Sequence, residues 1–266
     1  EDKCEEDKCE EDKCEEDKWE KEMPQSRRRP GKPRLQIAPI APFLESKRLY
    51  LFRGLNSAII PKIQLDSVAG YSVTPRDCAD LMTRLIYTAI QTRRRELGKS
   101  LNPLSMTIVD AMACIGGNTL SFSQVFGRVE ARELDEKRSE MLQHNMKVFG
   151  VSNVNAQQGN ALGLNLDELD ADAVFLDAEW GGPNYRAHRE ILKISNVPLD
   201  VVVSRILSSV DIVALKLPLG DSSAATLGAL RTLTNRQNLQ FSYYATGFRH
   251  LMALVILSNT NKNDCA

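Results

Sequence analysis

The sequence predicts an α/β fold in which a largely parallel sheet is covered by helices on both faces. Three observations predict it. An apolar run over residues 106–109 ends at Asp110 and leads through a glycine-containing turn into a helix. Stretches with strand and helix spacing then alternate along the chain. Strand-like runs such as Ala173–Leu176 are apolar throughout, which is typical of strands buried on both faces.

Each element follows from a local pattern. A helix is expected over 75–97, because Thr74 is a good N-cap, Pro75 suits the first helical position and apolar residues follow at helical spacing. Further helices are expected at 119–126, 136–149 and 185–194. Strands are expected over 106–109, 128–132, 153–158, 173–176, 212–217, 240–246 and 253–258.

The beginning of the chain has a different composition. Residues 1–22 repeat Glu-Asp-Lys-Cys-Glu, and residues 23–34 are basic and broken by prolines. We expect residues 1–34 to be a disordered acidic repeat and basic linker. Zinc binding by the repeated cysteines is a less favoured alternative, and the linker fits either an RNA or nuclear-targeting contact or a plain solvated segment. Residues 35–75 are expected to form a small helical appendage on a main domain over 76–266.

The overall composition narrows the class of protein. Apolar residues make up 42% and charged residues 26%, which is ordinary for a soluble globular chain. No apolar run is long enough to span a bilayer, and the N-terminus has no apolar signal region, so we expect no membrane contact. The six cysteines form no disulfide-like framework, which favours an intracellular, reducing compartment.

Acidic residues follow three of the expected strands. Asp110 opens the turn that leads to Thr119, and Glu133 lies 23 residues further on, where doubly wound folds hold ribose hydroxyls. Asp177 ends a third strand and is followed by an exposed-looking aromatic, Trp180. These positions predict a nucleoside-type cofactor. Hydride transfer is the weaker alternative, and nucleotide hydrolysis is not expected because the chain has no G-x-x-x-x-G-K-[ST] loop.

These stretches resemble the trimethylguanosine synthases, a family of RNA cap guanine-N2 methyltransferases, over roughly residues 49–218. Asp110–Thr119 is similar to the family's cofactor loop, Asp-Ala-Phe-Cys-Gly-Val-Gly-Gly-Asn-Thr. Trp180–Tyr185 resembles its catalytic loop, Pro-Pro-Trp-Gly-Gly-Pro-Asp-Tyr. Gly70–Pro75 matches part of its Gly-Trp-Phe-Ser-Val-Thr-Pro stretch. The three motifs occur in the family's order.

The resemblance implies a Rossmann-like methyltransferase fold with a mostly parallel seven-stranded sheet, S-adenosylmethionine as cofactor and 7-methylguanosine-capped RNA as partner. Its product would be a di- or trimethylguanosine cap. It further implies no metal, a monomer and a nuclear rather than cytoplasmic location. The catalytic residues would be Asp177 and Trp180. Cofactor contacts would come from Asp110, Gly116, Gly117, Asn118, Thr119, Glu133, Asn160 and Asp177. Substrate contacts would come from Trp180, Pro183, Asn184, Tyr185, Ser72 and Thr74.

The chain departs from the family pattern at four places. Cys114 replaces the first loop glycine, Glu133 replaces an aspartate, and Asn160 stands where an aspartate meets adenine. The paired prolines before the tryptophan are Ala178 and Glu179, which removes two rigid φ angles from the catalytic loop. Two alternatives therefore stay open: a catalytically degenerate homologue that binds an RNA cap or a protein partner, and a related methyltransferase acting on another amine.

Overall fold

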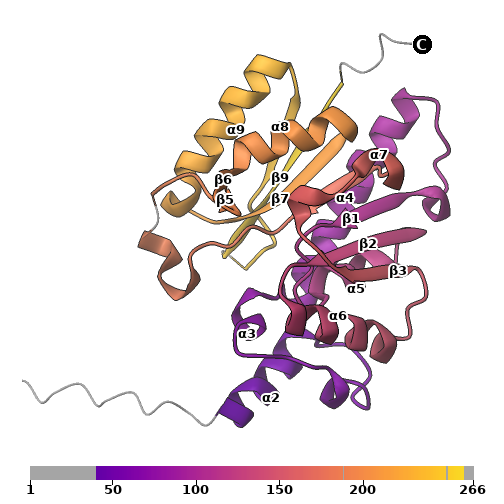
Figure 1. Cartoon of the computed structure of the whole chain (residues 1–266), viewed down its shortest axis with the longest axis vertical. Coiled ribbons are helices and arrows are strands. Elements are labelled where there is room, and N and C mark those ends of the chain that lie inside the picture. The colour runs from indigo at the N-terminus through magenta and orange to yellow at the C-terminus, as the bar shows by residue number, and fades with distance from the viewer. Residues whose placement is uncertain (1–39, 188, 250, 261–266) are drawn as a thin grey trace, which may run out of the picture. The chain divides into compact units, whose positions relative to one another are not determined.

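The computed structural model describes residues 40–187, 189–249 and 251–260, which all belong to one compact unit (Figure 1). The expected acidic repeat and basic linker over residues 1–34 lie outside the described residues.

A seven-stranded sheet forms the centre of this unit, in the order β3-β2-β1-β4-β7-β9-β8. The first five strands in that order run parallel, and β9 pairs antiparallel with both β7 and β8. The mostly parallel sheet of the Rossmann-like methyltransferase fold is thereby confirmed. The strands are β1 (Thr107–Asp110), β2 (Arg128–Glu133), β3 (Val154–Gln158), β4 (Ala173–Leu176), β7 (Ile212–Pro218), β8 (Gln240–Tyr244) and β9 (Met252–Ser258).

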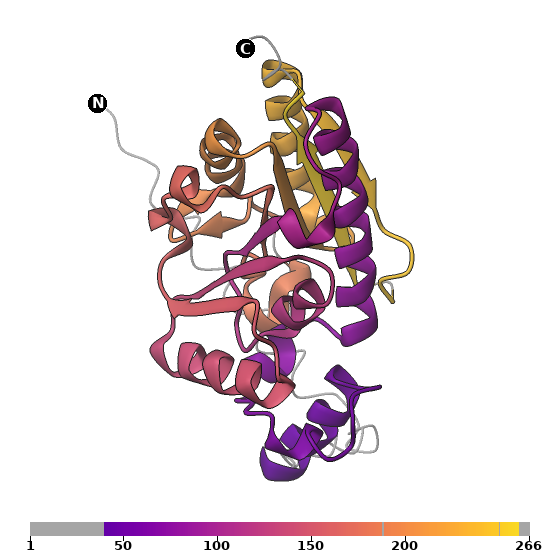
Figure 2. The same cartoon turned by 90° about the vertical axis from the view of Figure 1, so that its right-hand side faces the viewer.

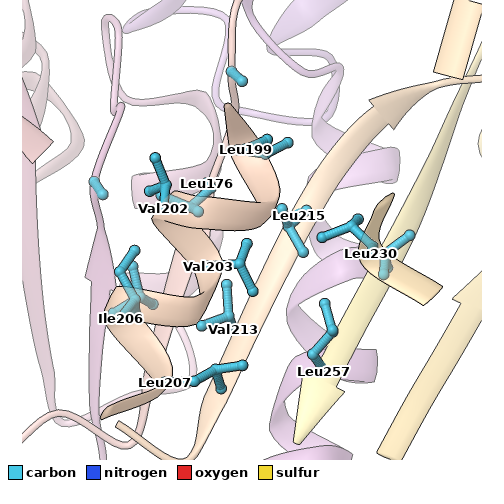
Figure 3. Close-up of a cluster of buried hydrophobic side chains, with 14 of the residues drawn as sticks. Leu176, Leu199, Val202, Val203, Ile206, Leu207, Val213, Leu215, Leu230 and Leu257 are labelled. Atoms are coloured by element: carbon cyan, nitrogen blue, oxygen red, sulfur yellow. The ribbon is translucent and has the colours of Figure 1, made fainter. Parts of the chain in front are cut away.

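Helices cover both faces because the central strands are apolar on both sides. On one face, α4 and α5 pack on strand residues such as Ile108 and Phe175; α4 is the long purple helix of Figure 2. On the other face, α8 and α9 cover the alternate strand residues. Figure 3 shows Val203 and Leu207 of α8 beside Val213 of β7. The main helices are α4 (Arg76–Glu96), α5 (Gly117–Ser123), α6 (Glu136–Phe149), α8 (Leu199–Ser209) and α9 (Ala224–Gln237).

The segment before α4 is helical and packs on the first half of the sheet domain. It contains α2 (Ile40–Leu51), the 3-10 turn η2 (Ile60–Lys62) and α3 (Ala69–Ser72). Its apolar side chains share a buried cluster with Ile115 of the turn after β1. The side-chain amide of Asn145 on α6 is fully buried. Its oxygen accepts from the Gln64 backbone N–H, and its NH2 group donates to the backbone carbonyls of Gln64 and Ile115. These contacts fix the segment against the turn.

Two expectations about helices are wrong. The described residues between 185 and 194 form no α-helix: the chain makes a 3-10 turn, η5 (Gly182–Ala187), and later a hairpin of β5 (Lys193–Ile194) and β6 (Val197–Pro198). The hairpin loop, Ser195 and Asn196, has positive φ at both residues, as a type I′ turn requires. The N-cap of α4 is Pro75 rather than Thr74, whose hydroxyl is used elsewhere.

The connections are short. They include η3 (Pro103–Ser105), η4 (Ala161–Gly163), α7 (Leu166–Leu169) and η6 (Asp221–Ser223). Among the helices of the described residues, none combines the length and apolar character needed to cross a bilayer.

Candidate active site

The turn after β1 is shaped by backbone that only small residues tolerate. Gly116 has φ +100°, and a Cβ on Gly117 would lie 2.7 Å from Val73 Cγ1 and 3.3 Å from the Thr74 carbonyl oxygen. The turn therefore packs directly on residues 72–74, which we call the 72–74 loop. Cys114 adopts φ +50°, in the left-handed region that favours glycine.

Asp110 ends β1 beneath this turn and is 1% exposed. Its Oδ2 accepts a hydrogen bond of 2.6 Å from the Thr119 hydroxyl, while Oδ1 is buried with no hydrogen-bond partner of good geometry among the described residues. Burial raises the pKa of Asp110 to about 7. The charge of Asp177 adds to the effect of burial, while the Thr119 hydrogen bond, the Lys216 ammonium and a hydrogen bond from the Met112 backbone lower the pKa. A buried carboxyl group with so few hydrogen-bond donors around it fits a positively charged or hydrogen-donating ligand.

Glu133 ends β2 and clamps the turn from the other side. One oxygen accepts from the Cys114 backbone N–H at 2.8 Å, and the other accepts from the Asp135 N–H at 3.0 Å and from Arg138 Nε at 3.4 Å. Each of its oxygens has two lone pairs, so the first oxygen keeps one acceptor position for a ligand hydroxyl. Asn160 is exposed, and its Oδ1 caps η4 by accepting from Leu162 N–H at 2.9 Å.

Asp177 follows β4 and pairs with Lys216, which lies in the middle of the buried strand β7. The Lys216 ammonium also donates to the Thr74 hydroxyl at 3.0 Å and to the Ser72 carbonyl at 3.2 Å. Burial raises the pKa of Asp177 above its usual value, and the adjacent ammonium opposes that shift. Lys216 was not predicted from the sequence; its signal is a single lysine within an otherwise apolar strand.

Trp180 is half-buried rather than exposed, and it packs against the hydrophobic clusters on both faces of the sheet. Its ring lies 5.3 Å from the Tyr185 ring, centroid to centroid, and the Lys216 Nζ stands 5.4 Å over the indole centroid. The indole Nε1 is buried with no hydrogen-bond partner among the described residues. The indole therefore has a cation on one face and an unpaired donor at its edge.

A narrow cleft joins these parts, between the 72–74 loop and the turn after β1. The fold brings six of the expected contact residues together in it: Ser72, Thr74, Asp110, Gly117, Asn118 and Asp177. Val73, Met112, Ala113 and Cys114 complete its lining. The remaining expected residues lie outside this lining: Gly116, Thr119, Glu133, Asn160, Trp180, Pro183, Asn184 and Tyr185.

The charges around the cleft fit a positively charged ligand. Two carboxyl groups, Asp110 and Asp177, line the cleft and share the influence of one ammonium, Lys216. With both carboxylates ionised, this group of three side chains carries a net negative charge, which a positively charged ligand neutralises. No group of three or more potential metal-ligating side chains occurs within the described part of the chain.

Comparison with known proteins finds a matching family and a similar viral protein. A family model described as RNA cap guanine-N2 methyltransferase matches residues 105–252, more than half of the chain. Uncharacterized protein L320 of Acanthamoeba polyphaga mimivirus is 27% identical over 192 residues, which cover 66% of this chain and 75% of that protein.

Two solved structures, one of them of an O-methyltransferase, are similar to this chain in fold. The O-methyltransferase from Bacillus cereus in complex with SAH aligns with a TM-score of 0.47 and 12% identity, over 84% of this chain and 93% of that chain. Trm5b from Pyrococcus abyssi aligns with a TM-score of 0.41 and 13% identity, over 74% of this chain and 50% of that chain. This chain thus spans half the length of the Trm5b chain.

Proposed function

Because the chain belongs to the RNA cap guanine-N2 methyltransferase family, we propose that it methylates the exocyclic N2 amine of the 7-methylguanosine cap of RNA. The product is a di- or trimethylguanosine cap, and the methyl donor is S-adenosylmethionine. The observation that carries the proposal is the cleft itself, in which Asp110 and Asp177 meet the 72–74 loop and the turn after β1.

Residues around the turn would hold the cofactor. When bound, S-adenosylmethionine supplies an electrophilic methyl group on a positively charged sulfur. Asp110 brings a carboxyl group to the cleft for that cationic ligand, and the close packing of Gly117 on Val73 leaves no room for a side chain at that position. Glu133 keeps an acceptor position for a ribose hydroxyl.

Asp177 is the group that orients the acceptor amine. The exocyclic amine is a weak nucleophile, so the site must align it and stabilise the positive charge that develops on its nitrogen. The Asp177 carboxyl lines the cleft and is a hydrogen-bond acceptor when ionised. Its raised pKa also suits it to receive the proton that the amine loses.

The loop that carries Trp180 is anchored without the family's two prolines. Ala178 is 2% exposed and belongs to the cluster under α8, and Asp177 beside it is held by Lys216. Of the two residues that replace the prolines, only Glu179 is exposed to solvent. This anchoring supports an active site rather than a degenerate one, because orientation of the amine depends on a fixed loop.

Trp180 would stack on the cationic 7-methylguanine base, to which an indole face is attracted. Lys216 stands over one face of the indole, so the base would stack on the other face, where the Tyr185 ring must leave room for it. Trp180→Ala should lower methyl transfer to a 7-methylguanosine cap dinucleotide by about 10- to 100-fold. The product is measured by mass spectrometry.

Two further variants and two outcomes make this test specific. Trp180→Phe keeps an apolar ring against both clusters and separates stacking from loss of packing. Tyr243→Ala removes an exposed aromatic from β8 and should transfer methyl groups like the wild type. Equal transfer by Trp180→Ala and wild type would reject the stacking role. Cap binding with no transfer by the wild type would favour the degenerate, cap-binding homologue.

A further inference from the structure

Lys216 is the charged residue at the centre of β7, whose sequence over residues 212–218 is otherwise apolar. It is 3% exposed, as deeply buried as the leucines on either side of it. Burying an ammonium is costly unless the charge is paired and its donors are satisfied. A lysine at this position therefore needs a reason beyond strand packing.

All three ammonium donors of Lys216 have acceptors, and these come from two distant segments. Asp177 lies on the loop after β4, while the Thr74 hydroxyl and the Ser72 carbonyl belong to the 72–74 loop. These acceptors line the cleft, whereas Lys216 itself does not. The ammonium thus lies behind the cleft wall and ties its two sides together.

Three further titratable groups lie around Lys216 and Asp177. They are Asp110 from β1, Cys114 from the turn after it and Cys78 from α4. Burial raises the pKa of Cys78 to about 11 and of Cys114 to about 12, so both thiols stay neutral. The Lys216 ammonium opposes the effect of burial on both Asp110 and Asp177.

We propose that Lys216 is a positioning residue of the acceptor site, which holds Asp177 as a carboxylate at the cleft and ties the 72–74 loop to it. The inference rests on the proposed function, because the carboxylate of Asp177 is what the acceptor amine requires. It adds a residue that the sequence motifs do not contain. Lys216 acts through Asp177 and has no contact with the cleft of its own.

The charge state of Asp177 can be read without any ligand from Trp180. The chain has two tryptophans, so Trp19→Phe leaves Trp180 as the sole indole, with Lys216 over its ring. In this background the fluorescence of Trp180 is followed from pH 3 to pH 9. A midpoint that disappears in Asp177→Asn belongs to Asp177.

Three substitutions at lysines then test the inference. Lys216→Met keeps the apolar stem and removes the charge, so the Asp177 midpoint should move to higher pH by about one unit or more. Lys216→Arg keeps the charge and should return the midpoint toward the wild-type value. Lys193→Met, at a half-exposed surface lysine, should leave it unchanged.

Methyl transfer is measured on the same variants over the same pH range. Lys216→Met should lower transfer about 10- to 100-fold and move the acidic limb of the rate profile in the same direction as the midpoint. In the Asp177→Asn background, Lys216→Met should lower transfer less than it does in the wild type, because only its tie to the 72–74 loop is then left to lose.

The outcomes separate this inference from the proposed function. An Asp177 midpoint that is the same in wild type and Lys216→Met overturns the inference, even if Lys216→Met also lowers the melting temperature. If the wild type transfers no methyl group to the cap, the proposed function fails, and the fluorescence midpoints still decide whether Lys216 holds Asp177 ionised.

Discussion

The carboxyl group of Asp110 is held inside the protein with one oxygen bonded to Thr119 and the other without a partner of good geometry among the described residues. Burial raises its pKa from 3.8 to about 7. Between these two pH values the folded protein keeps a proton that the unfolded chain has released. The free energy of unfolding therefore falls as pH rises through this window, and the loss is complete above about pH 7.

Asp110→Asn should remove this dependence. Titration of Asp110 changes the free energy of unfolding by at most about 4 kcal/mol between pH 4 and pH 8. The variant should therefore lose less stability than the wild type as pH rises. Urea unfolding at several pH values measures the difference. Asp170→Asn is the matched control, because Asp170 is exposed and its positive φ suits asparagine. A wild-type slope retained by Asp110→Asn would contradict the assignment.

The positions of the acids at the ends of strands were easier to predict from the sequence than the surroundings of the site residues. Asp110 and Asp177 end adjacent parallel strands, so their meeting at one edge of the sheet follows from strand order. Lys216 escaped prediction because a single lysine in an apolar strand has no local pattern that marks its partner. The half-burial of Trp180 depends on packing against both faces of the sheet, which no local glycine or proline reveals.

At the level of helices and strands, clear endings made prediction accurate. Strand β4 and helix α6 have the expected bounds, with Asp135 as N-cap and Gly150 in the left-handed conformation after the helix. Helices α8 and α9 were not predicted, because β-branched residues in the first and threonines in the second weaken the helical signal. The helix expected over 185–194 ran into β5, and the hairpin of β5 and β6 was not predicted, since its two-residue turn lacks glycine.

One buried ion pair joins α4 to the sheet at the edge opposite the cleft. Arg94 contacts both oxygens of Asp172, at 2.5 and 2.9 Å, and Asp172 also accepts from Thr107 N–H at 2.8 Å. Asp172→Ala leaves a guanidinium buried without its partner, so the free energy of unfolding should fall by about 3–5 kcal/mol. Glu190→Ala, which breaks a surface pair with Lys193, should cost less than about 1 kcal/mol. Similar losses for both variants in urea unfolding would contradict this account.

The cleft is formed by segments that lie far apart in the sequence. The 72–74 loop precedes the sheet, Asp110 and Asp177 end strands in its first half, and Lys216 comes from β7. The family match begins at residue 105, after the 72–74 loop. One wall of the cleft therefore lies outside the part of the chain that the family model covers, and it is tied to the rest by Lys216 and by the close approach of Gly117 to Val73.

The most direct test of the proposed function is the position of the transferred methyl group. Wild-type protein is incubated with S-adenosylmethionine and a 7-methylguanosine cap dinucleotide, and the product is fragmented in a mass spectrometer. We expect one or two added methyl groups on the fragment that contains the 7-methylguanine base, at N2. Methyl groups on a ribose or on the second nucleotide, or no transfer at high enzyme concentration, would contradict it.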